Sequence, residues 1–205
     1  MNSIKQNLRF FENQYQSVYS YIGGADEAGR GPLAGPVVSA IVILNPDKID
    51  ERINDSKKIK PALRSILSEV IKNQAVAYGI GAADPAEIDT INIFQATRLA
   101  FYRAYLNMRI KPDFLLTDAI LIPSIPLPQK AIIKGDSKSF SIAAASILAK
   151  VHRDKIMEQY ADEFPQYGFK KHKGYPVRAH IEAIQKYGIC RIHRVTFRPI
   201  KNDKN

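Results

Sequence analysis

Two apolar stretches near the N-terminus have the length and composition of β-strands. Residues 19–25 form the first, and residues 36–44, PVVSAIVIL, form a second that is apolar almost throughout. A strand without polar alternation is typical of a sheet that is covered on both faces. Because only a short Gly/Pro-rich turn joins the two stretches, we expect them to be antiparallel neighbours.

Helical and strand patterns alternate along the rest of the chain. Helices are expected over 60–73, 85–109 and 138–162, and strands over 75–83, 112–119 and 131–136. This alternation predicts an α/β fold with a mixed β-sheet flanked by helices. We expect a single domain over 1–205, with a core over about 19–163 and a small helical C-terminal region over about 164–205.

Acidic residues stand at three junctions of the predicted elements. Asp26 and Glu27 end the first strand, Asp118 ends the strand at 112–119, and Asp136 lies between a strand and a helix. One such residue alone is more often a turn former or a helix cap. A set of them at neighbouring strand ends suits a hard cation such as Mg²⁺ or Mn²⁺. Adjacent residues on a regular strand face opposite ways, so Asp26 and Glu27 can share one site only if the strand ends or bends there.

Another acid, Asp154, is excluded from this set by its position. It lies 18 residues beyond Asp136, which is about 27 Å along an unbroken helix. We therefore expect Asp154 to pair with a nearby basic residue. The four histidines and Cys190 show no zinc-ligand spacing.

The charge balance narrows the class of partner. The net charge is +10, and residues 150–205 hold 13 Lys/Arg against 6 Asp/Glu. A basic surface favours a polyanion such as a nucleic acid, although a generally basic solvated surface is the alternative. No apolar run reaches the roughly 18 residues of a membrane-spanning helix, and a single cysteine excludes an intrachain disulfide. These features predict a cytoplasmic protein without a membrane partner.

Several blocks of the sequence together resemble the ribonuclease HII family. The first is GADEAGRGPLAGPVV at 24–38, and the match runs in order over roughly residues 20–201. Further blocks are DSKK at 55–58, EIDTINIFQATRLA at 87–100, PDFLLTDA at 112–119, KGDSKSFSIAAASILAKVHRD at 134–154, FPQYGFKKHKGY at 164–175 and HRVTFRPIK at 193–201. The resemblance implies a ribonuclease H-like sheet. It also implies hydrolysis of the RNA strand of RNA–DNA hybrids and incision of duplex DNA 5′ to a single ribonucleotide, giving 3′-hydroxyl and 5′-phosphate ends.

Four carboxylates carry the chemistry in this resemblance. The family's acidic residues fall on Asp26, Glu27, Asp118 and Asp136, the same four that the strand ends single out. We assign Asp26 and Asp118 as the principal ligands of Mg²⁺ or Mn²⁺, with two ions during catalysis. Glu27 is an adjoining ligand, and Asp136 is a ligand or a proton-transfer partner.

A second group of residues is expected to bind the substrate. Backbone groups of Gly29, Arg30 and Gly31 would pair with a ribose 2′-hydroxyl, which distinguishes RNA from DNA. Tyr175 would pack on the neighbouring sugar. Candidate phosphate contacts are Lys57, Lys58, Ser137, Lys138, His172 and Lys173. Taken singly, the glycine loop is as well explained by a tight turn, the tyrosine by ordinary packing and the lysines by solvated charge.

The sequence leaves other functions open. A ribonuclease HIII-like enzyme would cut only continuous hybrids, but that family lacks the Gly-Arg-Gly loop and carries an extra N-terminal domain. A catalytically silent nucleic-acid-binding module would lose at least one of the acids, and a structure-selective DNA nuclease would cut all-DNA substrates. Thr117 and Ala119 around the third acid, and Val195 in HRVTF, depart from the family pattern without deleting a carboxylate. We expect a monomer, and no clear sliding-clamp motif is present.

Overall fold

A five-stranded mixed sheet forms the centre of the computed structural model, which describes residues 8–200. Its spatial order is β3-β2-β1-β4-β5. The strands are β1 (Ile22–Ala28), β2 (Val37–Ile43), β3 (Ala77–Ala83), β4 (Phe114–Asp118) and β5 (Gln129–Ile132). Strands β1, β2 and β3 are antiparallel, whereas β4 runs parallel to both β1 and β5. The predicted antiparallel pairing of the first two strands is confirmed.

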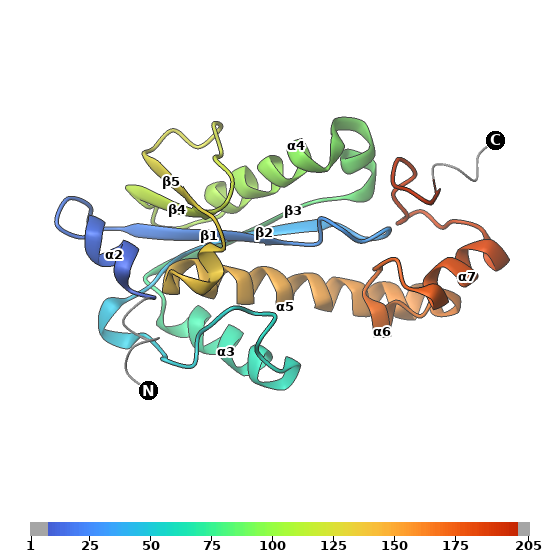
Figure 1. The fold of residues 1–205 in the computed structure, drawn as a ribbon, viewed down its shortest axis with the longest axis horizontal. Coiled ribbons are helices and arrows are strands. Elements are labelled where there is room, and N and C mark those ends of the chain that lie inside the picture. The colour runs from blue at the N-terminus through green and yellow to red at the C-terminus, as the bar shows by residue number, and fades with distance from the viewer. Residues whose placement is uncertain (1–7, 201–205) are drawn as a thin grey trace.

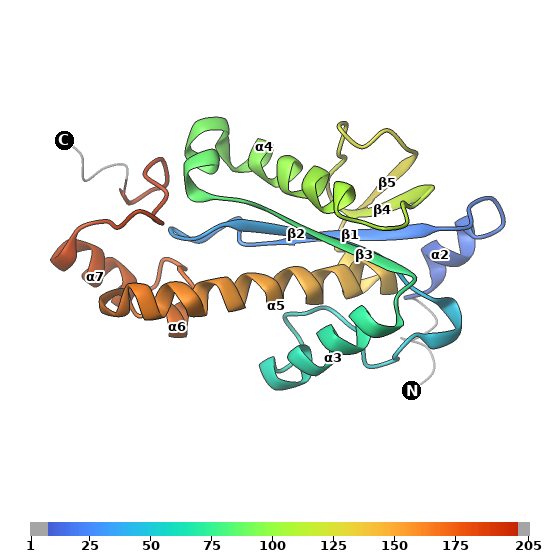
Figure 2. The same ribbon diagram turned by 180° about the vertical axis from the view of Figure 1, so that it is seen from behind.

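Helices cover both faces of this sheet. They are α2 (Phe10–Tyr15), α3 (Pro61–Gln74), α4 (Pro85–Leu106), α5 (Phe140–Glu163), α6 (Phe169–His172) and α7 (Arg178–Tyr187). Short 3₁₀ turns are η1 (Pro46–Lys48), η2 (Gly135–Ser137) and η3 (Pro165–Tyr167). Helix α5 lies along one face together with α3, α4 covers the other face, and α6 and α7 lie at one end of the molecule (Figure 1 and, from behind, Figure 2). No helix in the described part of the chain is long and apolar enough to cross a membrane.

The fully apolar strand β2 explains why the sheet is covered twice. Val38, Ala40 and Val42 face the core formed with α3 and α5, whereas Ile41 and Ile43 face the core formed with α4. All seven residues of β2 are buried. The prediction of a strand buried on both faces is therefore confirmed.

Three predicted elements differ from the structure in ways that affect the site or the helix covering the sheet. Strand β1 begins and ends three residues later than expected, so Asp26 and Glu27 lie within it. Strand β5 ends at Ile132, because Lys134 adopts a left-handed conformation (φ 57°) and the chain then forms η2. Helix α4 is interrupted at Asn92 (φ 66°). The Asn92 side chain accepts hydrogen bonds from two following backbone N–H groups and so caps the second part of α4.

The C-terminal part packs around its own small core at the end of α5. Phe169, Ile184 and Ile192 are buried there together with Met157 of α5. Residues 201–205 of the predicted C-terminal region lie outside the described residues. The division into a core and a C-terminal region stays a prediction.

Candidate active site

Two parallel strands and one turn bring three aspartates together. Ala25 of β1 pairs with Thr117 of β4, so the next residues, Asp26 and Asp118, lie side by side just beyond the last residue pair of these two parallel strands. The turn η2 is tied to β4 because the Gly135 N–H donates to Asp118 Oδ1 at 2.8 Å. That contact places Asp136, the next residue, at the same edge.

The three aspartates form a compact cluster. One carboxylate oxygen from each of Asp26, Asp118 and Asp136 lies within 4.8 Å of the other two. Asp26 is only 6% exposed and Asp136 5%. Burial raises the pKa of Asp26 well above its usual value, and the charges of Glu27 and Asp118 raise it further. Burial also raises the pKa of Asp136, and the charge of Asp55 adds to this.

This donor set fits a divalent metal ion. Carboxylate oxygens are the ligands that Mg²⁺ and Mn²⁺ prefer, and three carboxylates at this separation, two of them buried, repel one another unless a cation or protons neutralise them. A cation held by Asp26, Asp118 and Asp136 would remove that repulsion. The two residues assigned from the sequence as principal ligands therefore lie together in the structure, and Asp136 lies with them.

Glu27 lies outside this cluster. Pairing of β1 with β2 continues through Glu27 and Ala28, opposite Ser39 and Val38, so the strand neither ends nor bends at the acidic pair. One Glu27 oxygen accepts a long hydrogen bond of 3.4 Å from Arg30, and the other is buried without a hydrogen-bond partner among the described residues. Burial raises the pKa of Glu27, and the charge of Arg30 opposes that shift. The unpaired oxygen is free to accept from a ligand.

The Asp-Ser-Lys-Lys loop borders the cluster. The Lys57 ammonium lies 3.4 Å from Asp136 Oδ2, and its side chain is 81% exposed. Ser56 is fixed to α5 by a 2.6 Å hydrogen bond between its hydroxyl and that of Ser146. Lys58 instead pairs with Asp55, at 3.8 Å. Of the two predicted lysines, only Lys57 therefore lines the active-site pocket.

The Gly-Arg-Gly loop and Tyr175 face each other across that pocket. The pocket has a volume of about 230 Å³ and is lined by Asp26, Glu27, Ala28, Gly29, Arg30, Gly31, Ser56, Lys57, Ser146, Lys150 and Tyr175. Gly29 has a φ of 101°, and a Cβ there would lie 2.2 Å from Arg153 Nε. Only glycine satisfies both conditions. A Cβ on Gly31 would lie 3.9 Å from the half-exposed Tyr175 ring, so the loop and the ring share one opening.

A buried arginine anchors the loop from beneath. Arg194 is 0% exposed and forms no ion pair with a described residue. Its guanidinium donates to the carbonyls of Gly29 (2.6 Å), Arg30 (3.0 Å) and Gly35 (2.8 and 3.0 Å). These charge-assisted hydrogen bonds fix the peptide planes on both sides of Arg30.

A second buried arginine joins the loop to the tyrosine. Arg153 of α5 donates to the carbonyls of Pro36 (2.9 Å), Ala34 (3.0 Å) and Lys173 (3.0 Å). Its guanidinium carbon lies 5.9 Å from the centre of the Tyr175 ring. Neither arginine was singled out from the sequence. For Arg153 the signal in the sequence was its place on the predicted helix shortly after the mostly apolar run FSIAAASILA at 140–149.

A chain of neutral histidines supports Tyr175 from the C-terminal side. The Cys190 N–H donates to His193 Nδ1 (2.9 Å), the two Nε2 atoms of His193 and His180 are hydrogen-bonded (3.1 Å), and His180 Nδ1 donates to the Tyr175 carbonyl (3.0 Å). Burial lowers the pKa of His180 and of His193 to about 4. These hydrogen bonds require a single proton on each imidazole ring. A second proton on His180 would place its Nε2–H against the Nε2–H of His193.

The other predicted phosphate contacts lie outside the lining of the active-site pocket. His172 uses both ring nitrogens, because Nε2 donates to the Tyr167 carbonyl (2.7 Å) and Nδ1 accepts from the Gly174 N–H (3.2 Å). The Lys173 ammonium pairs with Glu158 at 2.8 Å. None of His172, Lys173, Ser137 or Lys138 lines the active-site pocket.

The N-terminus of α5, which follows Ser137 and Lys138, already has hydrogen-bond partners. The Ser139 hydroxyl caps the helix at Ile142 N–H and donates to Glu12 Oε1 at 2.6 Å. Glu12 Oε1 also accepts from the Ser141 N–H. A contact from Ser137 or Lys138 would therefore rely on the side chains themselves.

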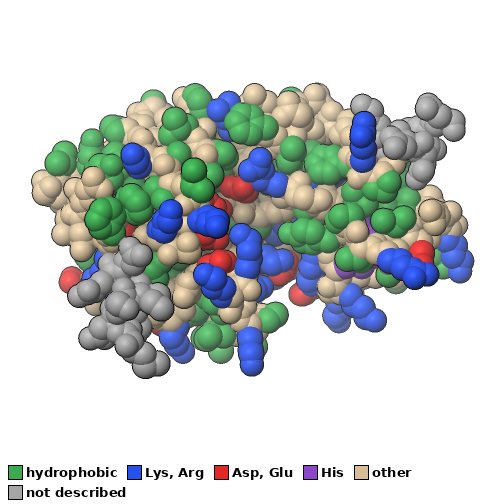
Figure 3. Space-filling view, in the orientation of Figure 1, with side chains coloured by type: hydrophobic (Ala, Val, Ile, Leu, Met, Phe, Trp, Pro, Cys, Tyr) green, Lys and Arg blue, Asp and Glu red, His purple; other side chains and the backbone are tan. Residues whose placement is uncertain are grey.

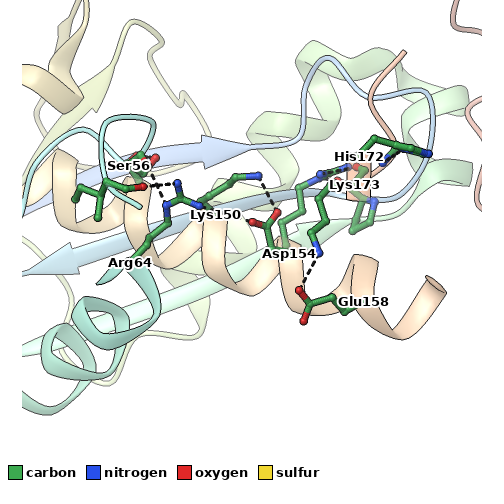
Figure 4. A network of polar contacts seen from close by, with 12 residues as sticks. Ser56, Arg64, Lys150, Asp154, Glu158, His172 and Lys173 are labelled. Atoms are coloured by element: carbon green, nitrogen blue, oxygen red, sulfur yellow. Dashed lines mark hydrogen bonds and ion pairs between the residues drawn. The ribbon is translucent and has the colours of Figure 1, made fainter. Parts of the chain in front are cut away.

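Asp154 is placed as expected. Lys150 donates to its carboxylate at 2.7 Å, and Arg64 lies 3.9 Å away, in the network that runs along α5 (Figure 4). The prediction of a basic partner is confirmed.

Comparison with known proteins identifies the family of the chain. A family model described as ribonuclease HII matches residues 23–200. Ribonuclease HII of Clostridioides difficile (strain 630) is 55% identical over 193 residues, covering 94% of this chain and 76% of its own length. Ribonuclease HII of Caldanaerobacter subterraneus subsp. tengcongensis is 53% identical over 193 residues, with coverages of 94% and 80%.

Solved structures share the fold. Ribonuclease H2 from Pyrococcus horikoshii OT3 superposes with a TM-score of 0.74 at 29% identity, covering 90% of this chain and 99% of its own. A Bst ribonuclease HIII in complex with Mn²⁺ gives 0.70 at 18% identity, with coverages of 88% and 68%, which shows the fold alone. The predicted ribonuclease H-like sheet is confirmed. The chain belongs to the ribonuclease HII family and is a metal-dependent endoribonuclease of the ribonuclease H type.

Proposed function

We propose that the chain, besides hydrolysing the RNA strand of RNA–DNA hybrids, incises duplex DNA on the 5′ side of a single embedded ribonucleotide. The products would carry 3′-hydroxyl and 5′-phosphate ends. The observation that carries this proposal is the shared pocket. The Gly-Arg-Gly loop and Tyr175 open onto the same space as the acidic pair Asp26-Glu27.

The carboxylates would hold the metal. Asp26 and Asp118 would be the principal ligands, and Asp136 completes the cluster. Glu27 has one buried oxygen without a hydrogen-bond partner, which could serve as an adjoining ligand. Divalent metal, two ions when substrate is bound, would activate water and stabilise the leaving 3′-oxygen. Lys57, beside Asp136, is placed to neutralise phosphate charge at the mouth of the pocket.

The loop would test the sugar. The Gly29 and Arg30 carbonyls each accept one hydrogen bond from Arg194, which holds this part of the loop in one conformation. Backbone groups of a fixed loop can donate to and accept from a 2′-hydroxyl, and a deoxyribose lacks that partner. The exposed Tyr175 ring offers a flat surface for the neighbouring sugar, whose missing hydroxyl allows close packing.

Three substrates test the proposal. End-labelled duplex DNA with one ribonucleotide, an all-DNA duplex and a continuous RNA–DNA hybrid are incubated with Mg²⁺, with Mn²⁺ or with EDTA. We expect a metal-dependent nick 5′ to the lone ribonucleotide, cleavage of the hybrid and no cleavage of DNA. Extension of the nick by a polymerase would establish the 3′-hydroxyl.

The alternatives give different patterns. Cleavage of the hybrid alone would indicate an HIII-like activity, and tight binding without cleavage would indicate a silent binding module. Tyr175→Ala sharpens the test. It should reduce incision at a single ribonucleotide more than cleavage of the hybrid, and equal losses would contradict the role given to the ring.

A further inference from the structure

A second hollow on the surface lies between the start of α3, the middle of α5 and the segment that comprises α6 and the residue after it. Its volume is about 370 Å³. We call it the basic groove. Five cations line it, namely Arg64, Lys155, Lys170, Lys171 and Lys173, together with the acids Asp154 and Glu158. The net formal charge of this lining is +3, so the groove attracts anions.

The two acids in the basic groove are already neutralised. Asp154 accepts from Lys150 and lies 3.9 Å from Arg64. Glu158 accepts from Lys173 at 2.8 Å (Figure 4). The carboxylates therefore fix the inner cations in place and leave little negative charge to repel a ligand.

The outer cations remain available. Lys170 and Lys171 are exposed and form no ion pair within residues 8–200. Lys155 has only a 3.9 Å contact with Glu69, and both side chains are more than half exposed. Such a contact contributes little and is readily exchanged for a stronger anion. Three flexible ammonium groups thus converge on one hollow.

The basic groove adjoins the active-site pocket. Lys150 lines the active-site pocket and donates to Asp154 in the groove, and the Ser56 carbonyl at the pocket accepts from Arg64. Glu158 lies eight residues beyond Lys150 on α5, about 12 Å along the helix axis. This is the length of three to four nucleotides at about 3.4 Å each.

The ligand chemistry follows from these contacts. An open groove with mobile lysines suits a chain of phosphodiesters, because ammonium groups act as point charges that do not depend on base sequence. Figure 3 shows Lys and Arg side chains around the acidic centre of this face and further ones toward α6 and α7. Resting on the proposed function, we propose that the basic groove binds the phosphate backbone of the duplex three to four nucleotides beyond the part that lies at Lys150 in the active-site pocket.

Binding experiments with two double variants test this inference. Lys170→Ala/Lys171→Ala removes the unpaired charges of α6. Lys48→Ala/Lys130→Ala removes the same charge from exposed, unpaired lysines of η1 and β5, away from α6 (Figure 1). Both are made in an Asp118→Asn background with Mg²⁺, and fluorescence anisotropy gives Kd for a long hybrid. We also use two shortened hybrids, each ending about two base pairs beyond the cut site on one side.

We expect the groove variant to raise Kd for the long hybrid about five- to tenfold at ~0.1 M salt. The slope of log Kd against log salt should fall by about two, because each of the two lysines would neutralise one phosphate. The hybrid that is shortened on the side of the basic groove should bind the groove variant and the control variant with the same Kd, because it no longer reaches the groove. The control variant should change Kd less than twofold, and both variants should retain the thermal midpoint.

Two results would overturn the inference. One is a groove variant that binds the long hybrid as the control does, and the other is an equal weakening of binding on all three hybrids. Cleavage of the continuous hybrid by the unmodified protein is measured separately. A failure of the proposed function is thereby distinguished from a failure of the groove.

Discussion

Replacing Arg194 by methionine tests whether a buried arginine holds the Gly-Arg-Gly loop. Methionine keeps an unbranched, flexible side chain of moderate size but provides no donor. The change would remove the Arg194 hydrogen bonds from the carbonyls of Gly29 and Gly35, where these bonds are buried, and from the carbonyl of Arg30, where the bond is partly buried.

The expected loss of stability follows from these carbonyls. An unsatisfied buried acceptor costs about 1–3 kcal/mol, so the two buried carbonyls give roughly 2–6 kcal/mol. Removing the guanidinium also relieves the cost of keeping a charge out of water, which offsets part of this. We expect a net loss of about 2–4 kcal/mol, a large part of the roughly 5–15 kcal/mol that keeps a domain folded. For a chain of this length that lowers Tm by about 10 °C.

Arg191 provides a matched control three residues earlier. Its guanidinium pairs with Glu163 at 2.6 Å, but its side chain is 61% exposed. Arg191→Met should therefore cost less than about 1 kcal/mol. Urea unfolding measures both variants, and incision at a single ribonucleotide relative to hybrid cleavage reports the loop. If Arg194→Met unfolds at the same urea concentration as Arg191→Met, the four hydrogen bonds do not hold the loop.

Three further predictions concern the metal cluster, the histidines and the sheet. Because the folded-state pKa of Asp26 is raised, its ionisation costs stability above that pKa, and the cost disappears as the pH falls through it. Mg²⁺ should therefore raise Tm by several degrees at pH 8 and much less at pH 5, and calorimetry on Asp118→Asn should show no rise. The lowered pKa values of His180 and His193 act in the opposite direction, since unfolding takes up protons below about pH 6.5. The free energy of unfolding, measured with urea, should fall by about 2 kcal/mol per histidine between pH 7 and pH 5. His180→Gln should make this free energy depend less on pH. Gly24→Ala would place a Cβ 2.0 Å from the Ser141 carbonyl carbon, so the variant should lose most of its stability in a thermal melt, whereas Gly31→Ala, with nothing closer than 3.9 Å, should melt normally.

The carboxylate cluster could be predicted from the sequence because its signals are local. An apolar strand that runs into an acidic residue identifies Asp26 and Asp118 without knowledge of the fold. The position of Glu27 could not be predicted in this way. It depends on whether β1 continues to pair with β2 beyond Asp26, and that pairing is set by the partner residues Ser39 and Val38. The pattern of a single strand therefore predicts where the acidic pair lies in the chain, but it does not predict where the Glu27 side chain lies relative to the cluster.

The buried arginines could not be predicted for a different reason. Arg153 reaches carbonyls 117 and 119 residues away, and Arg194 reaches others 159 to 165 residues away. No periodic pattern records such partners, and an arginine is normally expected at the surface. His172, a predicted phosphate contact, differs from the arginines, because its ring nitrogens bond to backbone groups only five and two residues away.

These long-range contacts connect the parts that recognise the substrate to the part that cuts it. Helix α5 carries Arg153, which holds the loop beside Gly35 and the segment before Tyr175, and it also carries Ser146 and Lys150 at the active-site pocket. The loop and the ring are thus held by one rigid helix, whose start is fixed to the Asp118 side through η2. A sugar accepted by the loop and the ring would therefore lie at a defined distance from the carboxylates. That distance, rather than any one contact, would select the phosphodiester on the 5′ side of the ribonucleotide.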